Sequence, residues 1–253
     1  MVSVVENIII GGKMKIIDEM STWIKEQVEQ AGAEGVVIGL SGGMDSSVVA
    51  ALAKRSLHDK VLGLILPCHS QKEDMEDANL IASHLQLETY TLDLSPVYDS
   101  LIAILPPADK NTTANLKPRL RMISLYYFAS LKNYLVAGTG NKSEILVGYF
   151  TKYGDGGADI LPLGDLLKSQ VREIAKQLAL PESIINKLPT AGLWPGQTDE
   201  GELKLTYEQL DQAILEITSN LGKRTPPEIF SRVEELIKKS EHKRLPIPVF
   251  KDY

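Results

Sequence analysis

Apolar residues recur along this chain of 253 residues with two periods, one typical of helices and one typical of strands. Residues 14–32 carry apolar side chains at helical spacing, and the short apolar runs 36–40 and 61–66 are typical of buried strands. Further along, the pattern predicts a helix at 72–85, a strand at 88–94, a short helix, a polar loop at 109–113, a long apolar helix through Met122 and Leu131, and a strand at 134–137. Because strands alternate with helices, we expect an α/β fold, a Rossmann-like parallel sheet flanked by helices.

Two long segments without a periodic pattern interrupt this alternation. Residues 150–164 are rich in Gly and Asp, and residues 189–202 are rich in Pro and Gly. Connections longer than about 12 residues are often lids or binding loops, so we expect both segments to close over a ligand. The chain then returns to helices, one with Tyr207, Leu210 and Ile214 on a common face and one that starts at Pro226 and Pro227. We expect residues 1–253 to form a single domain.

Composition and charge narrow the class of protein. Hydrophobic residues make up 43% of the chain and charged residues 24%, which is typical of a folded soluble domain. The net charge of −6 disfavours binding of a nucleic acid. The single cysteine, Cys68, cannot form an intramolecular disulfide, which fits a reducing cytosol. The first 15 residues do not resemble a signal peptide, and no apolar run approaches the ~20 residues of a membrane span, so we expect a cytoplasmic protein that does not bind a membrane.

The segment SGGMDSS, residues 41–47, lies between an apolar strand and a helix. Backbone amides and the helix dipole at such a junction can bind an anion, and glycines let the backbone approach it closely. Asp45 lies within the segment, and a carboxylate beside phosphates implies a bridging Mg²⁺. A glycine turn with a capping Ser or Asp is the alternative. The string SGGxDS at a strand end resembles the signature of the PP-loop ATP pyrophosphatases, which cleave ATP between the α and β phosphates.

Three further strings follow in a fixed order: GTGNKSE at 138–144, GYFTKYGDGGAD at 148–159 and PTAGLWPGQTDE at 189–200. With the first loop they resemble the ammonia-dependent NAD synthetases over about residues 36–207, which implies the adenine nucleotide alpha hydrolase-like (PP-loop) architecture. The resemblance implies ATP-dependent amidation of deamido-NAD with ammonia, through an adenylated carboxylate, to give NAD, AMP and pyrophosphate. This reaction is the last step of NAD biosynthesis. ATP is then a co-substrate and Mg²⁺ the cofactor.

The resemblance also implies which residues bind ATP and metal. Asp45 and Glu144 match the metal ligands, although Glu144 alone is equally typical of a solvated glutamate at a helix start. Lys168 follows the expected helix cap Asp165, and a cation in the first turn of a helix is unfavourable unless an anion lies nearby. The matched ATP contacts are Gly39, Leu40, Ser41, Gly42, Gly43, Met44, Asp45, Ser46, Ser47, Thr139, Lys168 and Thr190. For Thr139 and Thr190 the alternative is that each is only a turn residue.

A second set of positions matches the family's contacts to deamido-NAD, namely Arg119, Lys152, Asp159, His242 and Lys243. Next to Arg119, both Arg121 and Lys117 are equally typical of solvated helix charges. The basic tail at 241–248 is equally typical of a disordered terminus. Asp155 is our candidate for the group that takes a proton from ammonium, with a turn aspartate as the alternative.

We expect a homodimer, because NAD synthetases of this type are dimers and because residues 122–134 carry apolar side chains nearly all round a helix. A central core helix is the alternative. Glutamine-using relatives carry an amidotransferase domain with an activated cysteine. We expect no such domain here, and we expect Cys68 to pack in the core. Two other functions compete: another PP-loop ligase, either tRNA-modifying or similar to GMP synthetase, and a non-catalytic nucleotide sensor, which would lack Asp45 or Glu144.

Overall fold

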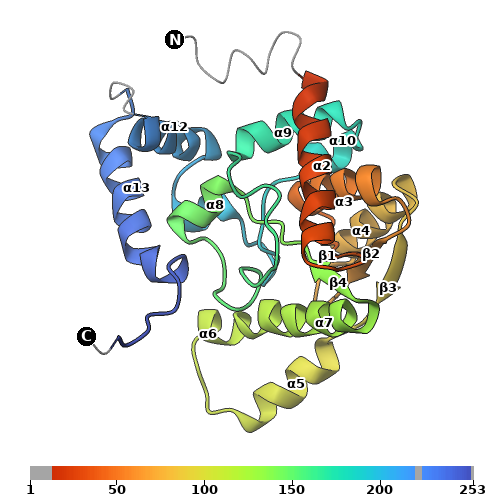
Figure 1. Ribbon diagram of the computed structural model, residues 1–253. Helices are drawn as coiled ribbons and strands as arrows, with labels where there is room; N and C mark the ends of the chain where they lie inside the picture. The colour runs from red at the N-terminus through yellow and green to blue at the C-terminus, as the bar shows by residue number, and fades with distance from the viewer. Residues whose placement is uncertain (1–12, 220–223, 252–253) are drawn as a thin grey trace.

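Four parallel strands form the centre of the computed structural model, which describes residues 13–219 and 224–251 (Figure 1). The strands are β1 (Gly35–Gly39), β2 (Val61–Ile65), β3 (Glu88–Thr91) and β4 (Tyr134–Val136). Their order is β3-β2-β1-β4, and the register pairs Val36 with Val61 on one side and with Leu135 on the other. The expected parallel α/β sheet is confirmed. The strand order reverses between β1 and β4, and ligands bind in the crevice at the carboxyl ends of strands at such a reversal.

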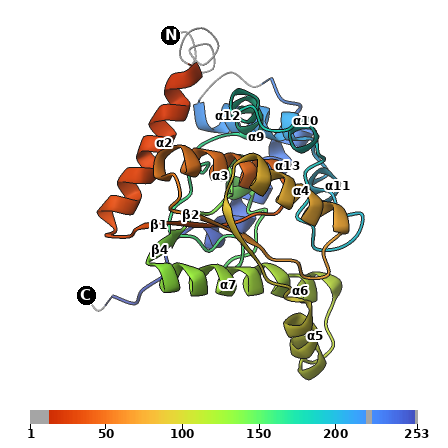
Figure 2. The same cartoon turned by 90° about the vertical axis from the view of Figure 1, so that its right-hand side faces the viewer.

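Helices cover both faces of the sheet. Helices α3 (Met44–Leu57) and α4 (Lys72–His84) lie on one face and α7 (Leu116–Lys132) on the other, while α2 (Lys13–Gln30) packs on α3 (Figure 2). The remaining helices are α5 (Ser95–Ile104), α6 (Lys110–Ala114), α8 (Lys142–Val147), α9 (Lys168–Gln177), α10 (Glu182–Ile185), α11 (Asp199–Leu203), α12 (Tyr207–Ser219), α13 (Pro227–Ser240) and the 3₁₀ turn η1 (Glu241–Lys243).

The hydrophobic core has a part on each face of the sheet. Successive side chains of β1 point to opposite faces, so Val36 and Ile38 pack with α3, whereas Val37 packs with Leu62 and the α7 side. All three β1 residues are fully buried. Burial on both faces explains why this strand appears in the sequence as a continuous apolar run. A separate cluster around Leu210 joins α12 to α13 and α8.

Three elements differ from the sequence-based prediction. The polar segment at 109–113 is not a loop but the start of α6, because the Asp109 side chain caps that helix by accepting a hydrogen bond from the Thr112 amide at 2.9 Å. Strand β3 ends at Thr91 rather than at residue 94, and all four of its residues are exposed because it forms the sheet edge. The segment 189–202 is not entirely a loop, because Thr198 caps α11 within it.

Two expectations concern the surroundings of the protein. No helix in the described part of the chain is long and apolar enough to cross a membrane. The expectation about a signal peptide falls mainly on residues 1–12, which lie outside the described residues.

Candidate active site

The first side of the site is the turn from β1 into α3. Gly42 has a φ of +75°, and a Cβ there would lie 2.6 Å from the Asp74 carbonyl oxygen of α4, so only glycine fits. The Ser41 hydroxyl accepts a hydrogen bond from the Gly43 amide at 3.2 Å. Ser46 donates its hydroxyl to the Gly43 carbonyl at 3.0 Å. The turn is thereby fixed, with the positive end of α3 directed at the crevice.

The second side is the turn from β4 into α8. Gly138 donates its amide to the Ile160 carbonyl at 2.9 Å, and an isolated parallel bridge joins Ala137 to Ile160. These bonds bring the segment 150–164 against the end of β4. Thr139 and Ser41 line one cavity of about 700 Å³, so both glycine-containing turns reach the same sheet edge, as predicted.

A buried ammonium joins the two sides of the site. Lys168, the first residue of α9, forms ion pairs with Asp45 of α3 and with Glu144 of α8, the latter at 3.2 Å. The side chains of Lys168, Asp45 and Glu144 are only 6%, 17% and 16% exposed. The anions required by a cation at a helix start are thus the protein's own carboxylates, and Glu144 is not a solvated surface residue.

The expected cap of α9 is wrong. Asp165 is 95% exposed and accepts a hydrogen bond from Lys142 Nζ at 2.8 Å. The helix starts later, where the Lys168 amide donates to the Ser143 hydroxyl at 3.0 Å. A side chain from α8 therefore caps α9, and the cap fixes Lys168 relative to Glu144.

The charges of this buried cluster do not balance. Burial raises the pKa of the Asp45 carboxyl, against the lowering effect of Lys168. Burial alone would lower the pKa of the Lys168 ammonium, but Asp45 and Glu144 raise it above its usual value. Two carboxylates and one ammonium leave one negative charge when all are ionised. Asp45 Oδ1 is buried and has no hydrogen-bond partner within the described residues.

This donor set fits Mg²⁺. Among the described residues no group of three or more His, Cys, Asp or Glu could hold a metal ion. Mg²⁺ is commonly held by one or two carboxylates with substrate phosphates and water, and Asp45 with Glu144 provides such a pair beside the phosphate loop. The unpartnered Asp45 oxygen and the excess negative charge are what such a cation would compensate.

Two further residues, Tyr207 and Asp199, contact this cluster. The sequence analysis did not identify them as site residues. The Tyr207 hydroxyl lies 3.1 Å from Glu144 Oε1 and 2.8 Å from Asp199 Oδ2, and its ring lies 5.0 Å from Lys168 Nζ. The helical period identified Tyr207 only as part of the buried face of α12. Asp199 Oδ1 is a second buried oxygen without a partner in the described structure.

The candidate base Asp155 lies in the wall of the same cavity. Its Oδ1 accepts a hydrogen bond from the Thr151 amide at 2.9 Å, as in a turn, so the two interpretations of this residue coexist. Desolvation by the surrounding protein raises the pKa of the Asp155 carboxyl, although the residue remains accessible from the cavity. Thr190 also lines the cavity and accepts a hydrogen bond from the Gly192 amide at 3.1 Å.

Most of the residues matched to deamido-NAD contacts lie beside the cavity rather than in its wall. Arg119 Nη2 donates to the Lys152 carbonyl at 3.3 Å, and Lys152 Nζ donates to the His242 carbonyl at 2.7 Å. Lys243 Nζ donates to the Gly148 and Phe150 carbonyls at 2.7 and 2.8 Å and does line the cavity. These contacts hold His242 and Lys243 of the basic tail against α8 and the segment 150–164.

Asp159 stands apart from that basic group. Its Oδ2 accepts a hydrogen bond from the Val136 amide at 2.7 Å, and its Oδ1 accepts one from the Tyr126 hydroxyl at 3.0 Å. Its two oxygens therefore bind the end of β4 and α7, respectively.

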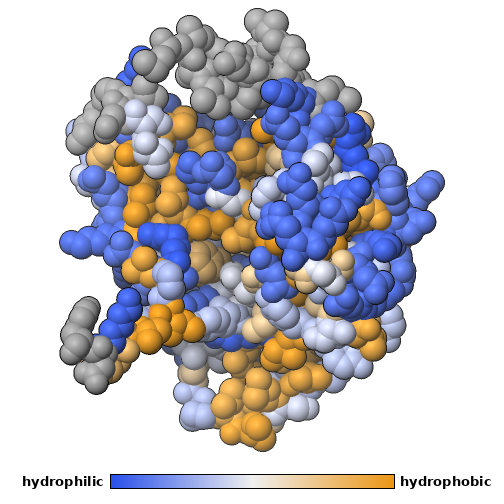
Figure 3. Space-filling model, viewed as in Figure 1, coloured by the Kyte–Doolittle hydropathy of each residue, from blue (hydrophilic) through white to orange (hydrophobic). Residues whose placement is uncertain are grey.

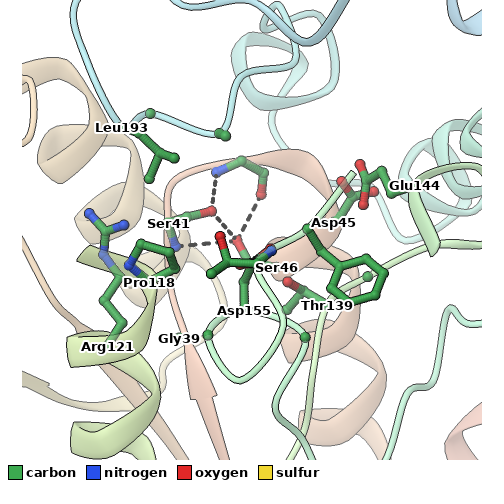
Figure 4. Close-up of a pocket in the computed structure, with 18 of the residues that line it drawn as sticks. Gly39, Ser41, Asp45, Ser46, Pro118, Arg121, Thr139, Glu144, Asp155 and Leu193 are labelled. Atoms are coloured by element: carbon green, nitrogen blue, oxygen red, sulfur yellow. Dashed lines mark hydrogen bonds between the residues drawn. The ribbon is translucent and has the colours of Figure 1, made fainter. Parts of the chain in front are cut away.

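Arg121 and Lys117 are not solvated helix charges. Lys117 is 7% exposed and donates to the Leu193 carbonyl at 2.8 Å. Arg121 lines the cavity and reaches the end of β2, where its Nε donates to the Leu66 carbonyl at 3.0 Å (Figure 4). The solvated alternative is wrong because α7 crosses beneath the carboxyl ends of the strands and directs this face into the site.

The fold and the cavity define a nucleotide-binding α/β protein, with a phosphate loop at the reversal of strand order and a paired carboxylate site beside it. Comparison with known proteins narrows this class further. The model of the family described as NAD synthase matches residues 16–247, and the chain belongs to that family.

Individual relatives agree with the family. The chain is 47% identical over 232 residues to the NH(3)-dependent NAD(+) synthetase of Carboxydothermus hydrogenoformans, covering 90% of this chain and 93% of the relative. Among solved structures it is similar to the NMN synthetase of Francisella tularensis, with a TM-score of 0.88, 38% identity and coverage of 95% and 98%. It is also similar to the NH3-dependent NAD synthetase of Campylobacter jejuni in complex with the nitrate ion, with a TM-score of 0.83, 33% identity and coverage of 94% and 98%.

Proposed function

We propose that this protein is an ammonia-dependent NAD synthetase, which converts deamido-NAD, ATP and ammonia to NAD, AMP and pyrophosphate. The observation that carries the proposal is the convergence of the phosphate loop with Asp45, Glu144 and Lys168 in one cavity of an NAD synthase family member. A carboxylate oxygen of nicotinate attacks the α phosphorus, and the bond to pyrophosphate breaks. Ammonia then attacks the acyl carbon, AMP leaves with the bonding electron pair, and the nitrogen loses a proton.

The residues of the two turns would bind ATP. The backbone amides and hydroxyls of residues 39–47 would hold the phosphates, and Thr139, Thr190 and Lys168 would complete the contacts. Asp45 and Glu144 would hold Mg²⁺, which when bound supplies positive charge to the phosphate oxygens. No nucleophile from the protein is needed, so catalysis rests on alignment of the reactants and on neutralisation of charge.

The basic group beside the cavity would bind deamido-NAD. Hydrogen bonds join Arg119 to Lys152 and Lys152 to His242, and the next residue, Lys243, lines the cavity. A dinucleotide that extends out of the cavity past Lys243 could therefore reach this group. Asp159 would contribute a carboxylate on the α7 side. Asp155 would take the proton from ammonium, because a carboxyl whose pKa is raised by burial is a better base than a free one.

The test is product analysis with purified protein. With ATP, Mg²⁺, deamido-NAD and ammonium, we expect equal amounts of NAD and AMP. Asp45→Asn should keep the fold and reduce AMP formation by several orders of magnitude. Wild-type rates in a folded Asp45→Asn variant at every Mg²⁺ concentration would contradict the assigned metal site.

A second candidate is the amidation of a mononucleotide to NMN by the same chemistry. It is favoured by one observation: the TM-score is higher for the NMN synthetase of F. tularensis than for the NAD synthetase of C. jejuni. The two candidates differ in whether the adenosine half of the substrate is bound. Comparing kcat/KM for deamido-NAD and nicotinic acid mononucleotide separates them. If the basic group beside the cavity binds the dinucleotide, Lys152→Ala should raise KM for deamido-NAD only.

We further propose that ammonia, and not glutamine, is the direct nitrogen source for this chain. Cys68 is fully buried in the core on the α7 side of the sheet, and burial raises the pKa of its thiol. Such a thiol is a packing group and a poor nucleophile, as expected from the sequence. A buried reduced cysteine also supports a cytoplasmic location.

We also propose a homodimer built on α7 and α5. Ile123, Tyr127 and Leu131 form a stripe at i, i+4 and i+8 of α7, and their exposed fractions are 60%, 65% and 65%. The neighbouring α5 has no buried residue, and Figure 3 shows apolar side chains gathered over it at the lower edge of the molecule. Helix α7 thus carries apolar side chains on its exposed face as well as on the face that packs on the sheet, and such a patch is typical of an interface.

Sedimentation velocity tests the dimer. We expect about twice the 27.8 kDa chain mass at micromolar concentration, and we expect Tyr127→Asp to give the monomer. A wild-type protein that sediments as a monomer over the whole micromolar range would contradict the proposal.

A further inference from the structure

Arg121 occupies a position in the cavity that the proposed function does not explain. Its Nε donates to the Leu66 carbonyl at 3.0 Å, and its Nη2 donates to the Ser70 hydroxyl at 3.3 Å. Both partners follow β2, so the guanidinium reaches from α7 across the end of β1 to the end of β2. The wall of the same cavity includes the apolar residues Leu40 and Met75.

The charges of Asp155 and Asp74 counteract the lowering of the Arg121 pKa by burial, but within the described residues neither carboxylate forms an ion pair with the guanidinium. Two other cations of the cavity wall are each held by two carboxylates, Lys168 by Asp45 and Glu144, and Lys187 by Asp74 and Asp77. Arg121 forms no ion pair with any carboxylate of the described residues. An unpaired charge removed from water is costly, which indicates that an anion completes this part of the site.

The surroundings increase this imbalance. Lys117 lies one helical turn before Arg121 on α7. It is buried, whereas Arg121 is partly buried, and it forms no ion pair with a described carboxylate. The neighbouring Cys68 thiol cannot serve as the counter-charge, because burial raises its pKa and keeps it neutral at pH 7. Burial likewise lowers the pKa of both Lys117 and Arg121.

The sheet topology identifies which part of a nucleotide lies near Arg121. β2 and β4 flank β1 on opposite sides, so Leu66 and Arg121 lie on one side of the phosphate loop, and Thr139 and Glu144 lie on the other. Figure 4 shows the same separation, with Arg121 and the Asp45–Glu144 pair on opposite sides of Ser41. If pyrophosphate leaves near the carboxylate pair and Lys168, the AMP portion lies on the Arg121 side, where apolar side chains can hold its base.

We propose that Arg121 is a substrate-binding residue whose guanidinium pairs with the phosphate of the AMP portion of the nucleotide. The proposal rests on the proposed function for the orientation of ATP. Arginine suits this role because its planar fork of donors matches phosphate oxygens, and Nη1 still has no hydrogen-bond partner among the described residues. The contacts to Leu66 and Ser70 hold the fork in place before the ligand arrives.

Binding of AMP and of adenosine separates a phosphate contact from every contact to the base. We would measure both affinities by ligand-observed NMR titration, which reaches millimolar dissociation constants, for wild type, Arg121→Gln and Arg121→Lys. Arg121→Gln should weaken AMP binding about ten- to a hundredfold, as expected for a hydrogen-bonded charge pair, and change adenosine binding less than about threefold. Arg121→Lys keeps the charge and should recover most of the AMP affinity.

Arg232 provides a matched control. Its Nε also donates to a backbone carbonyl, that of Leu203, at 2.9 Å, but it lies on α13 away from the cavity wall. Arg232→Gln should leave the ratio of AMP to adenosine affinity unchanged.

Three results would overturn the assignment. In the first, AMP affinity is unchanged in Arg121→Gln. In the second, adenosine affinity falls by the same factor as AMP affinity, which would mean that Arg121 stacks on the base or that the substitution disturbs the whole site. In the third result deamido-NAD binding weakens while AMP binding is kept, and Arg121 then faces the nicotinate carboxylate. These titrations need no turnover. If wild type makes no NAD but Arg121→Gln still loses its preference for AMP over adenosine, the proposed function fails and the phosphate contact stands.

Discussion

Replacing Lys168 with methionine isolates the contribution of one buried cation. Methionine keeps most of the side-chain volume, so the main change is that Asp45 and Glu144 lose their ammonium partner. All three side chains are less than one-fifth exposed. Breaking such a pair by removing one partner costs roughly 3–5 kcal/mol, because the remaining charge stays buried without compensation. For a chain of this size ~1 kcal/mol corresponds to about 2–4 °C, so the melting temperature should fall by roughly 6–20 °C.

Urea unfolding followed by circular dichroism, with a chelator present, measures this free energy of unfolding. Lys142→Met is the control, because Lys142 pairs with Asp165, whose side chain is 95% exposed, and such surface pairs contribute about 0–1 kcal/mol. A second comparison adds Mg²⁺. The Lys168→Met protein should gain more stability from Mg²⁺ than wild type, by up to ~2.7 kcal/mol at a hundred times the dissociation constant, because its carboxylate pair is no longer occupied by an ammonium.

Two outcomes would refute this reasoning. A Lys168→Met protein within ~1 kcal/mol of wild type would mean that the ammonium does not compensate the two carboxylates. An equal effect of Mg²⁺ on both proteins would mean that the metal and the ammonium do not share Asp45 and Glu144.

Three further predictions follow from the site. Gly42→Ala should lose about 1–3 kcal/mol of stability and most ATP affinity, because the added Cβ would lie 2.6 Å from the Asp74 carbonyl oxygen. Gly43→Ala is the control, because its added Cβ would meet only the Ser41 hydroxyl, at 3.2 Å. In the same urea-unfolding and ATP-binding measurements it should lose much less. Asp155→Asn should leave ATP–pyrophosphate exchange intact and slow amide formation. Since burial raises the pKa of Asp155, the wild-type rate at fixed free ammonia should fall with decreasing pH at a value above ~4, and the Asn variant should lack that decrease. Cys68→Ser should keep NAD formation from ammonium, and glutamine freed of ammonia should give none with either protein.

The sequence predicted the layers of the fold because each layer leaves a local pattern. β1 is a continuous apolar run because both of its faces are covered. In α2 apolar residues recur at helical spacing because only one face of the helix is buried. α6 was missed because its start depends on one Asp109 side chain that accepts a hydrogen bond, and not on any apolar period. The edge strand β3 was predicted too long because its residues are all exposed and nothing in the pattern marks where pairing ends.

The sequence predicted those site residues whose position is fixed by a backbone motif. It did not predict the residues whose side chains reach from one helix or strand to another. The motifs placed Asp45, Glu144 and Thr139 at one edge, and the structure brings them there. Whether Arg121 points to solvent or into the site depends on how α7 crosses the ends of the strands, which no local pattern records. Tyr207 shows the same limit, since periodicity identifies its buried face but not the two carboxylates that meet its hydroxyl.

The two long loops differ in how they are fastened, and this has a consequence for product release. The segment 150–164 is tied to the sheet by backbone bonds, with Gly138 donating to the Ile160 carbonyl and Asp159 donating to the Val136 carbonyl, both at 2.9 Å. The segment 189–198 is held to α6 and α7 by side chains, through Lys117 on the Leu193 carbonyl and Lys110 over the Trp194 ring at 4.2 Å. Displacing the first loop means breaking part of the sheet. Displacing the second from α6 and α7 breaks the two lysine contacts, which water can replace, while its bonds to α11, from the Asp199 amide to the Pro189 carbonyl and from Gln197 to Glu202, can move with it. We therefore expect residues 189–198 to move away from the cavity at lower energetic cost than residues 150–164, and such an opening can limit turnover when product release is slow.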